Sequence, residues 1–192
     1  MLKKYKLVLP LLLLLIILAA CGDDYEGDFS YPIQDFSFTN QDGDTVSKSD
    51  LDGEFWVANF IFTNCDTVCP PMTSNMARLQ NQLDEAGLDS VQLISFSVDP
   101  ENDTPEALKE FAESRKASFH NWNFLTGYEF EEIKEFSIKS FKSPLEKVAD
   151  SDQMMHGVSF FVISPEGNAI TRYTGTQPAE MERIVQDIKE MY

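Results

Sequence analysis

Residues 55–71 combine an apolar run, two cysteines and two prolines, in the order Phe55-Trp56-Val57-Ala58-Asn59-Phe60-Ile61-Phe62-Thr63-Asn64-Cys65-Asp66-Thr67-Val68-Cys69-Pro70-Pro71. The run from Phe55 to Phe62 has the length and composition of a buried strand. Apolar side chains then recur at helical spacing, at Met72, Met76, Leu79 and Leu83. Proline suits the first position of a helix, where its missing N–H costs nothing. The stretch therefore predicts a strand that turns directly into a helix, with Cys65 and Cys69 at the turn.

The residues that follow alternate between strand and helix patterns. Val91 to Val98 predicts a second buried strand, and Asp99 to Glu106 leads into a helix whose apolar face carries Leu108, Phe111 and Ala112. We expect Asp103 to be the N-cap of that helix, with Glu106 completing a capping box. A short strand from Trp122 to Leu125 and an amphipathic segment with Phe130, Ile133 and Phe136 come next, and the polar stretch from Lys142 to Gln153 is predicted to be a loop.

The two ends of the domain complete the pattern with hairpins. Asp35 to Ser47 predicts a small hairpin that turns at Asp42-Gly43. Val158 to Ile163 and Ala169 to Tyr173 flank a second turn, and Met181, Ile184, Val185 and Ile188 mark a final helix. Strands that alternate with helices and then end in a hairpin predict an α/β three-layer sandwich. Parallel units at the front and an antiparallel hairpin at the back suit a thioredoxin-like fold, with a central mixed sheet, flanking helices and an N-terminal hairpin.

The first 20 residues are typical of a secretory leader. Lys3, Lys4 and Lys6 precede a nearly unbroken apolar run from Leu7 to Leu18, which is shorter than the roughly 20 residues of a membrane-spanning helix. Leu18-Ala19-Ala20-Cys21 resembles the lipobox of bacterial lipoproteins, in which the cysteine receives a lipid. We therefore expect a signal peptide at 1–20, a lipid-anchored flexible tether at 21–30 that begins with Cys21, and a folded domain at 31–192. An ordinary secretory peptide or an uncleaved anchor, with Cys21 incidental, is the alternative, and each places the domain outside the cytoplasm. With the lipid anchor, the domain lies on the extracytoplasmic face of the cell membrane.

Charge and cysteine content narrow the function classes. The net charge is −17, and loss of the three leader lysines would leave 12 basic and 32 acidic side chains, a net charge of −20. Such a chain is poorly suited to nucleic acid. With Cys21 acylated, Cys65 and Cys69 form the remaining pair, in a compartment where disulfides persist.

Cys65 and Cys69 lie where a helix begins, so the macrodipole is expected to lower their thiol pKa and to raise the fraction of thiolate. Thiolate binds metal ions and attacks disulfides. If the turn is helical from about Cys65, both sulfurs face the same side and can bind one ion or oxidise to a disulfide. A purely structural disulfide is the alternative.

Two histidines offer further ligands. His156 precedes the strand Val158–Ile163, whose start faces the cysteine turn in a thioredoxin-like sheet, so His156 could supply a third ligand. We expect His120 to be an ordinary surface or edge residue. Met154 and Met155 lie beside His156 and are weaker ligand candidates, whereas Met72 and Met76 fit the apolar face of the helix.

Three motifs together resemble the Sco/SenC family: Cys65-Asp66-Thr67-Val68-Cys69-Pro70, Ser97-Val98-Asp99-Pro100 with Asp103-Thr104-Pro105, and Met155-His156. The resemblance implies a thioredoxin fold in which Cys65, Cys69 and His156 hold copper. It also implies a role in assembling the dinuclear copper centre of cytochrome c oxidase subunit II, with subunit II and a copper donor or thiol reductant as partners.

The ligand types agree with copper. Two thiolates and an imidazole suit Cu(I), and they can also hold Cu(II) with a further weak donor. Zinc competes for such ligands, but structural zinc usually takes four of them, and no fourth cysteine or histidine is placed to serve. Asp99 and Asp103 are explained by turn and cap roles.

The sequence leaves two functions open. The first is a copper metallochaperone, and the second is a dedicated thiol-disulfide reductase that prepares the cysteines of subunit II. In general thiol-disulfide oxidoreductases, two residues separate the two cysteines. These enzymes also have a proline just before the strand that faces the cysteines. Here three residues intervene, and His156-Gly157-Val158 stands where the proline is expected. Nothing at the cysteine turn indicates a peroxidase.

Overall fold

The computed structural model describes Tyr25 and residues 27–192. The predicted leader and Cys21 lie outside the described residues. Of the predicted tether, Tyr25 and residues 27–30 are described, and they contact the domain. The Tyr25 ring packs edge-on against Phe55 at 4.9 Å, and the Phe29 amide donates to the Ile170 carbonyl. Tyr25 and Phe29, within the stretch predicted as a tether, therefore lie against the domain.

The elements follow the predicted alternation. Their bounds in chain order are β1 (Tyr31–Pro32), β2 (Ser37–Thr39), β3 (Thr45–Ser47), η1 (Lys48–Leu51), β4 (Trp56–Ile61), α2 (Cys69–Glu85), β5 (Gln92–Ser97), α3 (Pro105–Glu113), β6 (Trp122–Leu125), α4 (Phe130–Phe141), β7 (Glu146–Lys147), β8 (Met154–Met155), β9 (Ser159–Ile163), β10 (Asn168–Thr174) and α5 (Ala179–Met191). The N-terminal hairpin is β2–β3, and Gly43 adopts the positive φ of 82° that its turn requires.

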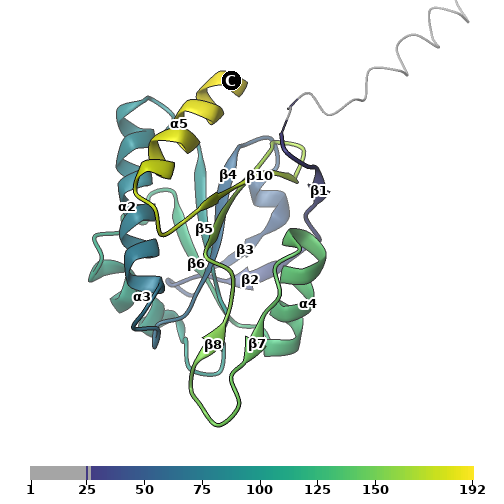
Figure 1. Ribbon diagram of the computed structural model, residues 1–192, viewed down its shortest axis with the longest axis vertical. Helices are drawn as coiled ribbons and strands as arrows, with labels where there is room; N and C mark the ends of the chain where they lie inside the picture. The colour runs from purple at the N-terminus through teal and green to yellow at the C-terminus, as the bar shows by residue number, and fades with distance from the viewer. Residues whose placement is uncertain (1–24, 26) are drawn as a thin grey trace, which may run out of the picture.

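A six-stranded mixed sheet forms the middle layer, in the order β1-β10-β9-β4-β5-β6. Strands β4, β5 and β6 are parallel, whereas β9 and β10 are antiparallel. Helices α2, α3 and α5 lie on one side of the sheet and α4 lies on the other (Figure 1). This is the predicted thioredoxin-like three-layer arrangement. None of the helices in the described part has the length and apolar character needed to cross a membrane.

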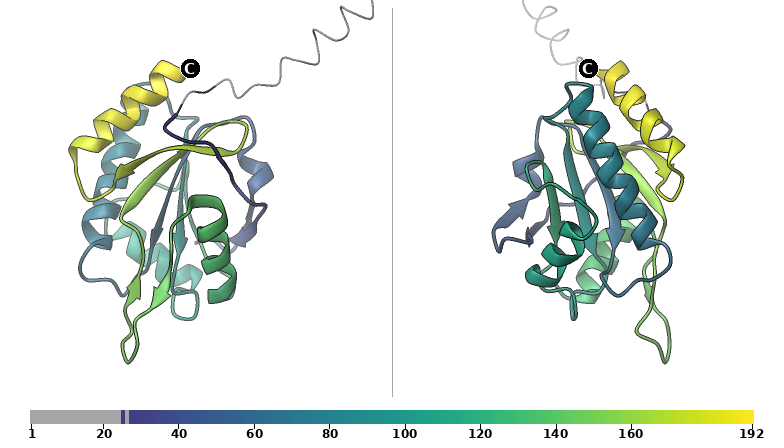
Figure 2. Two further views of the ribbon diagram at one scale, coloured as in Figure 1. Left: turned by 45° about the vertical axis from the view of Figure 1, so that its right-hand side comes forward. Right: turned by 90° about the vertical axis from the view of Figure 1, so that its left-hand side faces the viewer.

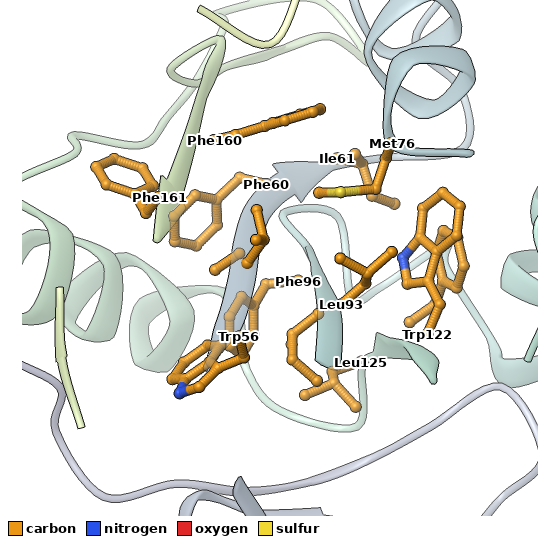
Figure 3. Close-up of a cluster of buried hydrophobic side chains, with 14 of the residues drawn as sticks. Trp56, Phe60, Ile61, Met76, Leu93, Phe96, Trp122, Leu125, Phe160 and Phe161 are labelled. Carbon is orange, nitrogen blue, oxygen red and sulfur yellow. The ribbon is translucent and has the colours of Figure 1, made fainter. Parts of the chain in front are cut away.

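Large apolar side chains hold the layers together (Figure 3). Phe96 of β5 packs against five aromatic rings, those of Phe36, Phe38, Phe60, Phe136 and Phe141. On the α2 side, Met72 and Met76 are fully buried, so they belong to the core as predicted. The core thus fixes α2, whose first residue is Cys69, firmly on the sheet.

Two local predictions were wrong. The stretch from Lys142 to Gln153 is not only a loop, because Glu146–Lys147 pairs with Met154–Met155 in the β7–β8 hairpin. The N-cap of α3 is Thr104, whose hydroxyl accepts from the Ala107 amide, and not Asp103. The side chain of Asp103 turns inward and is fully buried.

Strand direction brings the predicted site together. Because β9 is antiparallel to β4, the start of β9 lies at the edge of the sheet where β4 ends. The cysteine turn follows β4, and His156 precedes β9. Residues far apart in sequence therefore meet at the end of the molecule where the β7–β8 hairpin also lies (Figures 1 and 2).

Candidate metal centre

Cys65, Cys69 and His156 form one cluster. The two Sγ atoms and a ring nitrogen all lie within 4.8 Å of one another. Cys69 is fully buried, Cys65 nearly so, and His156 is half-buried. It is the one group of three or more Cys, His, Asp or Glu side chains with metal-ligand spacing among the residues that the structure describes.

The two cysteines come from different local structures. Cys69 is the first residue of α2, and Pro70 follows in the first turn, as predicted. Cys65 lies outside the helix, in the loop after β4, so a helix from Cys65 onward is not what aligns the sulfurs. The Cys69 amide instead donates to the Cys65 Sγ at 3.4 Å, and the Thr67 hydroxyl lies 3.6 Å from the same sulfur.

These surroundings give the two thiols different pKa values. Burial would raise the pKa of Cys65, but the hydrogen bonds from Cys69 and Thr67 outweigh it, so the pKa is lower than that of an ordinary cysteine. Burial raises the pKa of Cys69 well above its usual range, and the neighbouring Cys65 adds to this. The predicted lowering of the pKa by the helix dipole is thus wrong for Cys69, because desolvation dominates there.

His156 presents one nitrogen to the sulfurs. Its Nδ1–H donates to the Gly157 carbonyl at 2.9 Å, which leaves Nε2 as the unprotonated nitrogen. Nε2 lies 3.4 Å from the Cys69 Sγ, and the ring packs edge-on against Phe62. Burial lowers the pKa of His156, so the imidazole stays neutral and keeps a lone pair for a metal ion.

Asp103 positions the cysteine loop, a role that the sequence did not indicate. Its carboxylate accepts from the amide and hydroxyl of Thr63, at 3.2 and 2.6 Å, and from the Ser97 hydroxyl. These bonds join the end of β5 to the segment that leads to Cys65. Burial raises the pKa of Asp103. Asp99, by contrast, accepts from the side chain of Asn102 and has the predicted turn role.

A second contact ties the loop to the β7–β8 hairpin. The Asn64 side chain donates to Asp152 at 2.8 Å, and the Gln153 side chain donates to the Asn64 carbonyl. Met154 packs partly against the core, whereas Met155 is 58% exposed.

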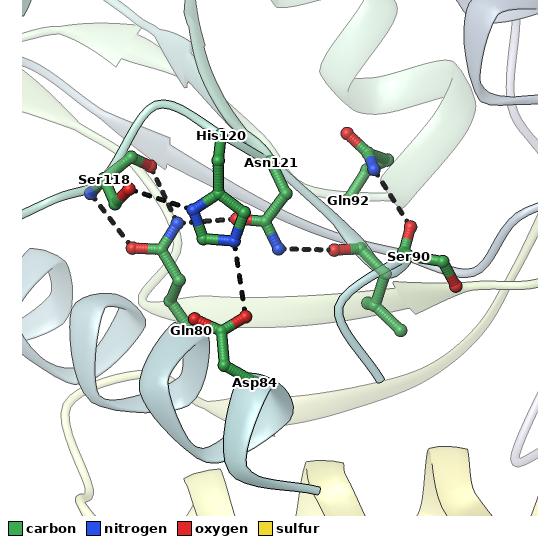
Figure 4. Close-up of polar contacts among 8 residues, drawn as sticks. Gln80, Asp84, Ser90, Gln92, Ser118, His120 and Asn121 are labelled. Atoms are coloured by element: carbon green, nitrogen blue, oxygen red, sulfur yellow. Dashed lines mark hydrogen bonds and ion pairs between the residues drawn. The ribbon is translucent and has the colours of Figure 1, made fainter. Parts of the chain in front are cut away.

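His120 lies away from this centre, as predicted. It contacts Ser118 and Asp84 on the surface, at 2.9 and 3.3 Å (Figure 4). Beneath it, Gln80 and Asn121 share a hydrogen bond, and Gln80 also bonds to Ser118. This network fixes α2 to the segment before β6.

Fold and site together define a thioredoxin-like protein with a dithiol and a facing histidine. A model of the SCO1/SenC family matches residues 27–192. The SCO1 protein homolog of Bacillus subtilis is 47% identical, over 92% of each chain. The mitochondrial protein SCO2 of Saccharomyces cerevisiae is 29% identical over 70% of this chain, which spans only 45% of that relative. The chain belongs to the SCO1/SenC family.

Solved structures agree with this assignment. A SCO1/SenC family lipoprotein from Bacillus anthracis has 46% identity and a TM-score of 0.80, with 84% of this chain and 95% of that chain covered. BsSco, described as a member of the Sco family of cytochrome c oxidase assembly proteins with a disulfide switch, has 46% identity and a TM-score of 0.79, over 87% and 97% of the chains. Arabidopsis thaliana ScoI, solved with copper bound, has 26% identity and a TM-score of 0.70, over 82% and 98%.

Proposed function

We propose that this protein is a copper metallochaperone that binds copper through Cys65, Cys69 and His156 for the dinuclear copper centre of cytochrome c oxidase subunit II. The observation that carries the proposal is the meeting of two sulfurs and one unprotonated imidazole nitrogen within 4.8 Å. Copper-bound relatives of this family support the choice of metal.

The ligand set fits copper as cargo. Two thiolates and an imidazole are soft donors that suit Cu(I), and Cu(II) is accommodated with one further weak donor. Three protein ligands leave a position open for a sulfur of the acceptor. No fourth cysteine or histidine joins the cluster in the described part of the chain, which disfavours structural zinc.

The proposed location is the outer face of the cell membrane, with a lipid on Cys21. The lipobox-like Leu18-Ala19-Ala20-Cys21 supports it, and so does the description of the Bacillus anthracis relative as a lipoprotein. Tyr25 packs against Phe55, just before β4, and the cysteine turn follows β4, so the two lie at opposite ends of that strand. An anchor before Tyr25 would leave the copper site facing away from the membrane, toward an acceptor domain.

Transfer of copper to the copper-free soluble domain of subunit II tests this function. We expect the copper-loaded wild-type chain to fill that domain, and a Cys65→Ser/Cys69→Ser variant to carry no copper to it. The His120→Ala variant is a matched control, since it removes the other histidine, and should transfer normally. Failure of the loaded wild-type chain to fill the acceptor would exclude delivery.

The unequal thiols favour a second candidate, a dedicated reductase of the subunit II cysteines. A more acidic Cys65 beside a buried Cys69 of raised pKa resembles an attacking and a resolving thiol. Two electrons would pass from the dithiol to the acceptor's disulfide, which would leave a Cys65–Cys69 disulfide and an acceptor dithiol. His156→Ala separates the functions, because reduction needs only the sulfurs whereas copper binding needs the imidazole.

A further inference from the structure

A groove with a basic lining runs between α2 and the segment that follows α3. It has a volume of about 630 Å³, and its lining includes Ser74, Arg78, Glu85, Arg115 and Lys116. The right-hand view of Figure 2 shows this face of the molecule, with α2 in front. Three of the lining residues are cations, and Glu85, at the end of α2, is the single acid.

These cations stand out because the chain is strongly acidic, with 32 acidic and 15 basic side chains. Most lysines of the domain pair with a neighbouring carboxylate, among them Lys48, Lys109, Lys134, Lys139 and Lys147. Arg78, Arg115 and Lys116 make no ion pair within the described residues. The groove therefore concentrates uncompensated positive charge on a protein that carries little of it.

Arg115 is held in place before any ligand arrives. Its guanidinium lies 3.8 Å from the Phe111 ring centre, and Nη1 donates to the Phe111 carbonyl and the Ser114 hydroxyl. Nε and Nη2 make no hydrogen bond to any described residue. A planar guanidinium with free donors is suited to a carboxylate.

Lys116 occupies a position that favours glycine. Its φ is 65°, in the left-handed region, just after α3 ends. The Ala117 amide closes the helix end by donating to the Ala112 carbonyl, a geometry in which glycine is the usual residue. A lysine here carries a backbone strain that glycine would relieve.

The groove follows the helix that Cys69 begins. Ser74, the lining residue nearest the start of α2, lies little more than one helical turn after Cys69. A chain bound in the groove and continued past Ser74 would run toward the start of α2, where Cys69 lies.

We propose that this groove docks an acidic segment of the protein that exchanges copper or electrons with Cys65 and Cys69. The inference rests on the proposed function and names the chemistry of the partner's contact surface. From Ser74 to Glu85, α2 rises by about 16 Å, which an extended segment of about five residues would span. Carboxylates of that segment would pair with the three cations, and Glu85 would mark the end of the bound stretch.

Binding of a hexaglutamate peptide to the full chain in neutral detergent micelles tests the proposal. The Arg78→Gln/Arg115→Gln/Lys116→Gln variant should bind it about tenfold or more weakly than wild type, because each lost charge pair contributes modestly. Arg172→Gln/Lys142→Gln/Lys189→Gln is the matched control. It removes the same charge from three cations outside the groove, which also lack ion pairs among the described residues, and should bind like wild type.

Lys116→Gly guards against misfolding as an explanation, because it relieves the strained φ. We expect a melting temperature no lower than that of wild type, together with weaker peptide binding. An equal loss in both triple variants, or no binding by wild type at low ionic strength, would overturn the proposal. So would occupation of the groove by phosphatidylglycerol added to the micelles without binding of the peptide, since the surface would then face lipid.

A copper titration of the same variants separates this proposal from the proposed function. The groove variants should bind copper like wild type. Lost peptide binding with intact copper binding in the groove variants is the result expected here. Absence of copper binding in wild type would refute the metallochaperone and leave the groove measurement valid.

Discussion

The Nε2 atom of His156 lies 3.4 Å from the Sγ atom of Cys69, although 87 residues separate them in sequence. The antiparallel pairing of β9 with β4 places them together. The carbonyl of Gly157 accepts a hydrogen bond from Nδ1–H, so the nitrogen that faces the sulfur is the one with a lone pair. A thiol and an imidazole in this relation can share a proton or replace it with a metal ion.

The unequal surroundings of the cysteines predict the order of their alkylation. The pKa of Cys65 is lowered and that of Cys69 is raised. At a given pH, the thiolate fraction of Cys65 is therefore larger than that of an ordinary cysteine, and the thiolate fraction of Cys69 is smaller. With iodoacetamide across a pH series, peptide mass spectrometry should show Cys65 modified first and at lower pH. Modification of Cys69 first would refute the assignment.

Gly157 is predicted to set the position of His156. A Cβ at this residue would lie 2.9 Å from the Ser143 hydroxyl oxygen, too close for an undisturbed contact. Gly157→Ala should therefore shift the neighbouring imidazole and weaken Cu(II) binding, measured by titration, while the fold persists in circular dichroism.

The double variant Ser143→Ala/Gly157→Ala is the control for this contact. It removes the hydroxyl that the new methyl group would meet, so affinity for Cu(II) should recover toward wild type. If the single and double variants bind alike, the contact with Ser143 does not position His156.

Asp103 is predicted to make the stability of the domain depend on pH. Burial raises its pKa in the folded state above the unfolded value near 3.8. The folded state then holds the proton more tightly, so this contribution to the free energy of unfolding is full below about pH 4 and is lost as pH rises through the folded pKa.

Asp103→Asn keeps a similar shape and removes that titration. Chemical denaturation at several pH values should show the wild type losing stability relative to the variant as pH rises from about 4. A difference between the two proteins that stays constant with pH would show that Asp103 does not titrate in this way.

Cys21→Ala tests the predicted anchor. The wild-type chain should fractionate with the membrane and begin, after processing, at a lipid-modified Cys21, as the Leu18-Ala19-Ala20-Cys21 pattern predicts. The variant should be released or remain unprocessed, which fractionation and intact mass will detect. Unchanged retention with an unchanged mature N-terminus would contradict lipidation at this residue.

Much of the fold follows from local sequence. The apolar run before Cys65 and the helical spacing of Met72 and Met76 were enough to predict β4 and α2, because burial of those side chains leaves few alternatives. Strand direction then predicted that His156 would face the cysteines. Both inferences depend on regular periodicity, which the sequence displays directly.

Other features depend on contacts that sequence does not display. Asp103 and Thr104 are both suited to cap a helix, and hydrogen bonds from Thr63 and Ser97 hold the side chain of Asp103 inward. The β7–β8 hairpin lacks an alternating pattern, so its polar residues predicted a loop. The predicted lowering of the Cys69 pKa was wrong because it considered only the helix dipole. Burial in the folded core, which the sequence does not display, raises this pKa.

Copper X-ray absorption on the loaded protein tests the central claim most directly, since it reports the atoms bound to the metal. For the reduced wild-type chain loaded with Cu(I), we expect one copper per chain with two sulfur ligands and one imidazole nitrogen. In His156→Ala the imidazole signal should vanish while both sulfurs remain, and Cu(II) should bind more weakly still, since two thiolates alone suit Cu(I) better. An imidazole signal that persists in His156→Ala, or a wild-type spectrum without two sulfurs, would contradict the account.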